Sequence, residues 1–142
     1  MPRLSSLIAP VALLALSATP VLANETWNCT YVGHWSRSSG GGGDFTWRIR
    51  WRKSDEGWRL SGDYQDSSGS SRFDGKCANK SCRFWQRYIG GSLDGKTYYY
   101  QGSYTDTWYG DSKTVNQFTG TWGSTRDGND GNWSANATCI KQ

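Results

Sequence analysis

Residues 45–53 read Phe-Thr-Trp-Arg-Ile-Arg-Trp-Arg-Lys, so large apolar side chains alternate with polar ones along the whole stretch. A period of two places the two kinds of side chain on opposite faces of a β-strand, one for a core and one for solvent. The same alternation recurs along the chain, interrupted by Gly, Ser and Asp, and no segment shows a helical period. The chain is therefore predicted to be all-β, with about eight strands at residues 26–35, 44–53, 58–65, 72–77, 82–89, 96–104, 114–122 and 132–140.

A short repeat runs through five of these strands: a large residue, any residue, glycine, any residue and a second large residue. It occurs at residues 31–35, 60–64, 73–77, 100–104 and 118–122. The three marked positions share one face. Glycine between two large side chains lets a sheet coil tightly or lets a neighbouring ring lie over the backbone. The repeat predicts a single small antiparallel up-and-down β-barrel.

Two of the repeats, "LSGDYQDS" from Leu60 and "FTGTW" from Phe118, resemble the strand repeats of the avidin and streptavidin family, and more loosely those of calycin barrels. The resemblance implies the barrel fold. The amino-terminal biotin-site pattern of that family has no match in "TWNCTYVGHW". The resemblance therefore implies no binding residue.

Residues 1–23 have the features of a secretory signal peptide: Arg3 near the start, an apolar run and a small-residue cleavage site at Val21–Ala23. The apolar run is short and is interrupted by prolines, which argues against a membrane span. We therefore expect a mature barrel domain of residues 24–142, periplasmic or secreted and without a membrane span.

Turn lengths predict how the strands pair. A four-residue turn at residues 54–57 places Trp51 opposite Leu60, so that the inward faces of the two strands coincide. In the same scheme, Tyr64 lies opposite Phe73 on the next strand. The side chains of each face then continue from strand to strand around the barrel.

The chain has four cysteines, and an even number in a small exported chain usually forms disulfides, here with three possible pairings. The predicted register favours one of them. Cys77 and Cys82 face each other across the turn between two strands. Cys29 and Cys139 lie on the first and last strands, which become antiparallel neighbours when the barrel closes.

The predicted interior is aromatic, because 9 Trp, 8 Tyr and 4 Phe suit strands better than helices. Such rings commonly fill a small eight-stranded barrel. The first function that we predict is nevertheless that of an exported binding protein whose rings line a site for a small hydrophobic or aromatic ligand, entered from the Gly-rich loops at 36–43, 66–71, 90–95 and 123–131. The residues predicted to line that site are Trp47, Trp51, Tyr64, Gln86, Tyr100, Asn116 and Trp122.

The predicted outer face is basic. Eight Arg or Lys and two Asp on the second to fifth strands give this face a net charge of +6, against +4 for the whole chain. A solvated, aggregation-resistant face is one interpretation. The other is an interaction surface of the inhibitor or immunity type for an acidic protein or glycan, because Trp85 interrupts the polar pattern. Its predicted contact residues are Arg48, Arg50, Arg59, Arg83, Trp85 and Arg87.

The sequence offers little for catalysis, and we expect no enzyme, cofactor or metal site, with a small hydrolase as a remote alternative. The single histidine, His34, is predicted to point outward. Asp63 and Asp74 come out as neighbours on the outer face, where arginines surround them. The loop at residues 126–132 resembles a calcium loop superficially but lacks its ligand spacing. Nucleic acid is not expected as a partner of an exported protein, and the oligomeric state is left open.

Overall fold

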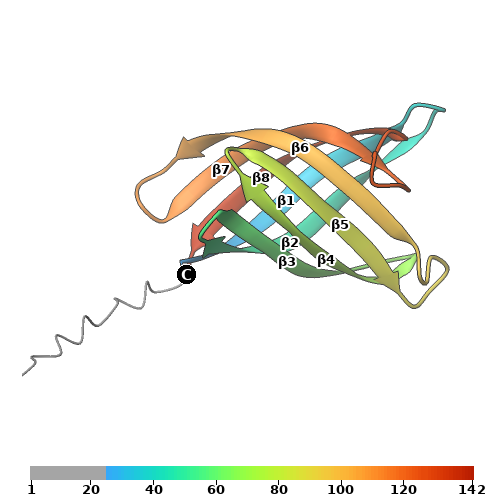
Figure 1. Ribbon diagram of the computed structural model, residues 1–142, viewed down its shortest axis with the longest axis horizontal. Coiled ribbons are helices and arrows are strands. Elements are labelled where there is room, and N and C mark those ends of the chain that lie inside the picture. Colours follow the sequence, from blue (N-terminus) through green and yellow to red (C-terminus); the bar gives the residue numbers. More distant parts are fainter. Residues whose placement is uncertain (1–24) are drawn as a thin grey trace, which may run out of the picture.

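The computed structural model describes residues 25–142, which form a closed barrel of eight antiparallel strands in chain order (Figure 1). The predicted fold class is confirmed. The predicted signal peptide lies outside the described residues. Residues 25–142 include no helix that is long and apolar enough to cross a membrane. The strands are β1 (Thr26–Arg37), β2 (Gly42–Ser54), β3 (Gly57–Asp66), β4 (Gly69–Ala78), β5 (Ser81–Ile89), β6 (Thr97–Trp108), β7 (Lys113–Gly123) and β8 (Gly131–Lys141).

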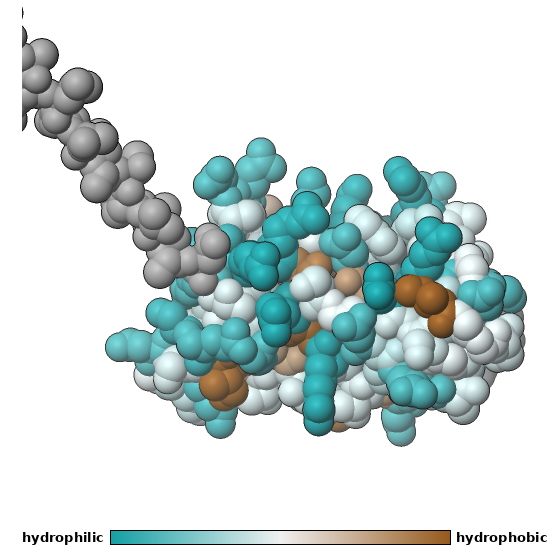
Figure 2. Space-filling view, turned by 90° about the horizontal axis from the view of Figure 1, so that it is seen from below, coloured by the Kyte–Doolittle hydropathy of each residue, from teal (hydrophilic) through white to brown (hydrophobic). Residues whose placement is uncertain are grey.

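Side chains alternate between the two faces of the barrel wall as the sequence period predicts. In β5, for example, Cys82, Phe84, Gln86 and Tyr88 are buried and the residues between them are exposed. Hydrophilic side chains project from the outer surface seen from below in Figure 2, among residues of intermediate hydropathy and a few hydrophobic ones, on the side where Figure 1 places β2, β3 and β4. The wall therefore has a packed inner face and a separate outer face that is free for other roles.

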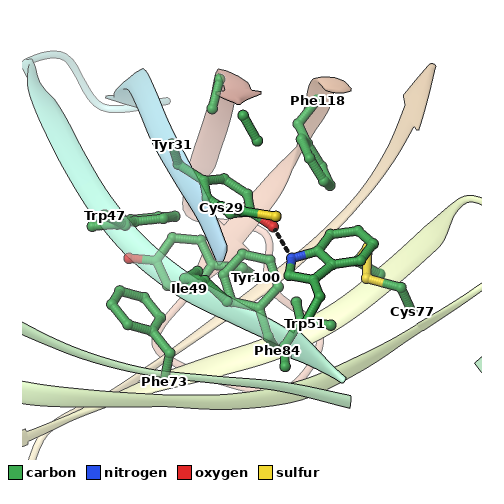
Figure 3. Close-up of a cluster of buried hydrophobic side chains, with 14 of the residues drawn as sticks. Cys29, Tyr31, Trp47, Ile49, Trp51, Phe73, Cys77, Phe84, Tyr100 and Phe118 are labelled. Atoms are coloured by element: carbon green, nitrogen blue, oxygen red, sulfur yellow. Dashed lines mark hydrogen bonds between the residues drawn. A yellow bond between two sulfur atoms is a disulfide. The ribbon is translucent and has the colours of Figure 1, made fainter. Parts of the chain in front are cut away.

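Trp47 occupies the middle of the interior. Its indole is stacked on Phe45 at 3.8 Å between ring centroids, and lies 4.9 Å from Phe73 and 5.0 Å from Tyr100. Figure 3 shows rings from strands all around the barrel converging in this way. The middle of the barrel is therefore filled by the chain's own side chains.

The repeated glycines make room for these rings. Gly102 of β6 and Gly120 of β7 are paired in the sheet, and the Trp133 indole lies directly over them. Its Nε1 donates to the carbonyl oxygens of Gln101 and Thr121, at 3.2 and 3.1 Å. A Cβ at Gly120 would come within 2.6 Å of that same nitrogen, so only glycine allows the ring to approach so closely.

The β2–β3 register agrees with the prediction, since Trp51 pairs with Leu60. The predicted β3–β4 register is wrong by two residues, because Tyr64 pairs with Ser71 rather than with Phe73. The cause is the turn after Asp66. Its carboxylate accepts a hydrogen bond from the Ser68 amide at 2.8 Å, an Asx-turn that shortens the expected loop to two residues. A shift of two keeps every side chain on its predicted face.

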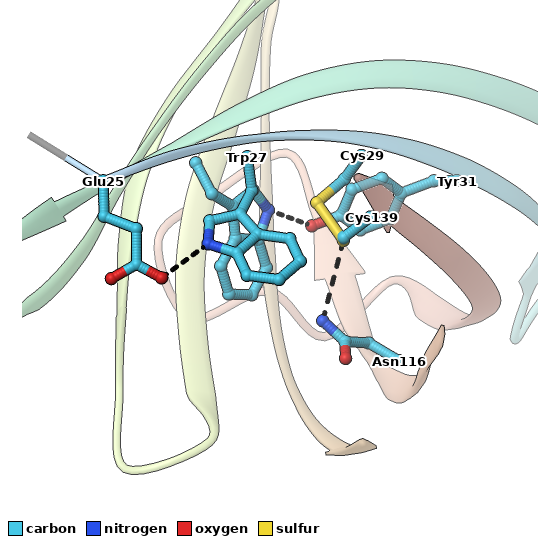
Figure 4. Close-up of a disulfide and its surroundings, with 7 residues drawn as sticks. Glu25, Trp27, Cys29, Tyr31, Asn116 and Cys139 are labelled. Atoms are coloured by element: carbon cyan, nitrogen blue, oxygen red, sulfur yellow. Dashed lines mark hydrogen bonds between the residues drawn. A yellow bond between two sulfur atoms is a disulfide. The ribbon is translucent and has the colours of Figure 1, made fainter. Parts of the chain in front are cut away.

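Both predicted disulfides are confirmed. Cys29–Cys139 joins β1 to β8, the strand pair that closes the barrel, and Asn116 donates to the Cys139 sulfur at 3.8 Å (Figure 4). Cys77–Cys82 flanks the β4–β5 turn. Both lie toward the end of the barrel that holds the C-terminus (Figure 1). We call this the terminal end, and we call the opposite end, with the turns after β1, β3, β5 and β7, the loop end.

The two disulfides should differ in how much they stabilise the fold. Cys29–Cys139 links residues 110 apart in the chain and Cys77–Cys82 links residues only 5 apart. Because each disulfide lowers the entropy of the unfolded chain, we expect the first to stabilise the fold by about 5 kcal/mol and the second by about 2 kcal/mol. We expect urea unfolding of Cys29→Ala/Cys139→Ala to show the larger loss, with Cys77→Ala/Cys82→Ala as the matched control. All four sulfurs are equally buried, so equal losses would contradict the argument.

Candidate functional site

All of the predicted ligand-lining residues face the interior, where six are buried and Tyr64 is half-buried. Their polar atoms bind the protein itself. Trp51 donates to the Tyr31 hydroxyl at 2.8 Å (Figure 3), and Trp122 donates to the Ser36 carbonyl at 3.0 Å. Within residues 25–142, no buried side-chain nitrogen or oxygen lacks a hydrogen-bond partner. The interior therefore offers a ligand no unsatisfied polar group.

A hydrogen-bonded network lies between the core and the loop end. Gln86 accepts from the Tyr100 hydroxyl and donates to Ser71, each at 2.9 Å, and Tyr88 donates to the Asp66 carboxylate at 2.7 Å. Burial raises the pKa of Tyr100 and Tyr88 well above the ordinary tyrosine value, and the Asp66 carboxylate raises that of Tyr88 further. The network satisfies the buried amide of Gln86 and holds both tyrosines in their neutral form.

The outer face carries a line of positive charge. Four residues at paired positions of β2, β3, β4 and β5 follow one another across the sheet; we call them the cation row, and they are Arg52, Arg59, Lys76 and Arg83. Neighbouring strands lie about 4.8 Å apart, so the row spans roughly 14 Å. A second like-charge pair, Arg72 with Arg87, lies on the same face beyond the pair of Asp74 and Trp85. The sequence-derived register had separated Arg59 from Lys76.

Asp63 and Asp74 do not lie directly opposite each other, which corrects the sequence-derived arrangement. The two-residue shift pairs Asp63 with Arg72, and the two side chains approach to 3.6 Å. Asp74 lies 3.6 Å from Arg59. Both ion pairs are exposed and contribute little stability. These carboxylates therefore act as salt-bridge partners and do not form a facing pair for acid and base catalysis.

The predicted contact residues fall into two groups. Arg59, Arg83, Trp85 and Arg87 line one groove with a volume of about 680 Å³ on the outer face of β3 to β6. Arg48 and Arg50 lie in a different depression, beside Asp63 and Arg72. The structure thus places four of the six predicted residues, Trp85 among them, in one groove. We call the outer face of β2 to β5 the cationic wall.

Sequence reasoning missed Arg126, which lines the same groove. Its loop, between β7 and β8, lies against β6, where Gln101 donates to the Asp127 carbonyl at 3.4 Å. Asp130 braces the loop by accepting from the amide and hydroxyl of Ser124 at 2.8 and 3.1 Å. Nothing local in the sequence indicates that this loop folds toward β6, because the contact joins segments distant in the chain.

His34 and the loop at residues 126–132 are the remaining candidates for a catalytic or metal site. His34 Nδ1 lies 2.8 Å from the Asp44 carboxylate on the exposed outer face. The part of the chain that the structure describes contains no group of three or more His, Cys, Asp or Glu side chains placed to hold a metal ion. The Asp130 carboxylate, which belongs to the loop that resembles a calcium site, is engaged by Ser124 instead.

The buried tyrosines should make the fold sensitive to alkali. The folded protein keeps the Tyr100 proton above pH 10, whereas the unfolded chain loses it at about pH 10, so stability should be fully present below that pH and fall above it. We expect Tyr100→Phe to reduce this slope by up to about 1.4 kcal/mol per pH unit, measured by urea unfolding from pH 9 to 11.5. The control is the difference in free energy of unfolding between the wild type and Tyr100→Phe at pH 7, where the tyrosine is neutral in both states. An unchanged slope would show that Tyr100 ionises in the folded state.

Comparison with known proteins supports the architecture and no finer assignment. No protein-family model and no curated protein sequence matches the chain. The crystal structure of the ywiB protein from Bacillus subtilis is similar, with a TM-score of 0.50, 10% sequence identity, and coverage of 83% of this chain and 93% of that chain. At this identity the likeness concerns the fold alone. The resemblance to avidin and calycin barrels likewise extends to a closed, eight-stranded antiparallel barrel and does not establish that family.

Proposed function

We propose that the protein is a non-enzymatic binding protein that works outside the cytoplasm and holds an anionic macromolecule against its cationic wall. The observation that carries this proposal is the cation row. Like charges placed directly opposite each other on neighbouring strands destabilise a sheet, and the row contains three such contacts in succession. The barrel does not need them, because the core lies on the other face.

Most of these charges form no ion pair. Among the outward-facing Arg and Lys side chains of β2 to β5 within residues 25–142, only Arg59 and Arg72 form ion pairs. Local rules of sheet stability are commonly broken where function requires it. A bound polyanion would neutralise the row and remove the repulsion between its members.

The outer faces of β7 and β8 are uncharged over most of their length, in contrast to the cationic wall. The outward positions from Val115 to Thr121 of β7 and from Asn132 to Thr138 of β8 carry only hydroxyl, amide or apolar side chains. The positive charge is therefore concentrated on one side of the barrel, where it would attract and orient an anionic partner.

The proposed location rests on the two disulfides and on the amino-terminal sequence. Both disulfides are typical of an oxidising, extracytoplasmic environment. The signal-peptide pattern of residues 1–23 is consistent with export. A periplasmic or secreted partner follows from this proposal.

A small aromatic ligand at the loop end is the second candidate. Tyr64 and Tyr98 are half-buried rings that pack against the core, and the Tyr98 ring lies 6.1 Å from that of Trp122. They could cover a flat apolar ligand. Such binding would quench tryptophan fluorescence and would not respond to 0.5 M salt, unlike binding on the cationic wall.

Charge reversal tests the proposed function. We expect Arg59→Glu/Arg83→Glu to weaken binding to polygalacturonate and to poly-L-glutamate by more than about tenfold, because repulsion replaces attraction. Wild-type binding should fall as salt rises. The matched control is Lys113→Glu/Lys141→Glu, which changes the net charge equally at the terminal end. No wild-type binding to either polymer, or equal loss in the two variants, would overturn the proposal.

The cation row should also lower the free energy of unfolding of the barrel. Lys76 lies between Arg59 and Arg83, so Lys76→Gln should raise the free energy of unfolding by about 0.2–1 kcal/mol while weakening polyanion binding. Lys113→Gln is the control, because its paired residue is the apolar Ile140. Urea unfolding at low salt checks the first effect. A less stable Lys76→Gln variant would mean that the lysine is part of the stabilising structure.

A further inference from the structure

The groove beside the cation row has an aromatic floor. Trp85 of β5 and Tyr99 of β6 are paired residues on neighbouring strands, and both line the groove. The Trp85 side chain is large and hydrophobic, yet 42% of its surface is exposed. An exposed tryptophan among positive charges is an unusual use of an outward strand position, because it neither fills the core nor improves solubility.

Polar groups of two kinds surround this floor. Arg83, Arg87 and Arg126 supply positive charge from β5 and from the braced β7–β8 loop. The Asp74 carboxylate and the Thr97 and Gln101 side chains supply hydrogen-bond acceptors at the groove wall. The groove thus offers cations for an acidic group, acceptors for hydroxyl groups and rings for an apolar surface.

We infer that this groove binds an anionic saccharide, a hydroxylated sugar ring that carries a carboxylate or sulfate group. The ring would pack its C–H face against Trp85 and Tyr99, its acidic group would meet the arginines, and its hydroxyl groups would donate to Asp74. Three members of the cation row, Arg59, Lys76 and Arg83, line the groove itself, and Arg52 extends the row beyond it, so a further acidic sugar of the same chain could follow the row. This inference rests on the proposed function and names its ligand class.

Size and charge favour a saccharide over the other polyanions. A volume of about 680 Å³ lies in the range of small-ligand sites, so the groove can accommodate sugar rings. Aromatic rings and cations would also suit single-stranded nucleic acid. The Asp74 carboxylate favours the saccharide over single-stranded DNA, since it can accept hydrogen bonds from sugar hydroxyl groups, which the internal nucleotides of a DNA strand do not have.

The site is also held in place before any ligand arrives. The β7–β8 loop that carries Arg126 is tied by Asp130 to Ser124 and by Gln101 to Asp127. Gly128, whose φ of 51° is left-handed, is buried in this loop and lines the groove. A preorganised loop reduces the entropy lost on binding.

Isothermal titration calorimetry with short oligomers tests the inference. The probes are hexagalacturonate, neutral maltohexaose, hexaglutamate and the single-stranded DNA dT6. We expect hexagalacturonate to bind best and maltohexaose to bind weakly. Trp85→Ala should lower hexagalacturonate affinity about tenfold and remove most of the fluorescence change on binding. Trp108→Ala, which removes another exposed tryptophan at the end of β6, is the matched control and should change neither.

The outcomes separate this inference from the proposed function. If Trp85→Ala binds hexagalacturonate like the wild type while Arg59→Glu/Arg83→Glu does not bind, the saccharide inference falls and the polyanion function stands. Tighter binding of hexaglutamate or of dT6 would also overturn the inference, in favour of an acidic peptide or nucleic acid. If no anionic probe or polymer binds, both are overturned. Circular dichroism of each variant verifies that the barrel is folded.

Discussion

The packing of aromatic rings over glycine is the interaction on which the barrel depends. The Trp133 indole lies across the paired Gly102 and Gly120 and donates to the carbonyl groups beside them. This contact brings the ring of β8 against β6 and β7, so the interior can hold Trp47 and its neighbouring rings within eight strands. Larger side chains at the two glycines would collide with the indole, and the wall could not close around the same core.

A filled interior has a direct consequence for function. In residues 25–142 every buried side-chain nitrogen and oxygen has its partner within the protein. The central ring cluster therefore stabilises the fold by packing and offers no free polar group. The outer face is under no such constraint, because its side chains alternate with those of the core. The cationic wall therefore carries charges that the fold does not require, and its like-charge contacts are tolerated because the aromatic core and two disulfides stabilise the barrel independently.

Particular residues show how far sequence reasoning reached. The alternation at residues 45–53 assigned Trp47 and Trp51 to the core correctly, since period two is a property of the strand itself. The pairing of Cys29 with Cys139 followed from barrel closure. The β3–β4 register was missed because Asp66 forms an Asx-turn that local loop composition did not reveal. The predicted face of each side chain was still correct after this two-residue shift, whereas the predicted cross-strand partners of Asp63 and Asp74 were wrong.

The sequence by itself determined the class of fold, the face of each side chain and the two disulfides, because periodicity, glycine spacing and cysteine count act locally or through barrel closure. Only the tertiary structure decided that Arg59 lies between Arg52 and Lys76, and that Arg126 joins Trp85 in one groove. Both depend on long-range geometry: a two-residue step in strand pairing, and a loop that folds against β6. Charge on the outer face could be predicted, but its arrangement into a row and a groove could not.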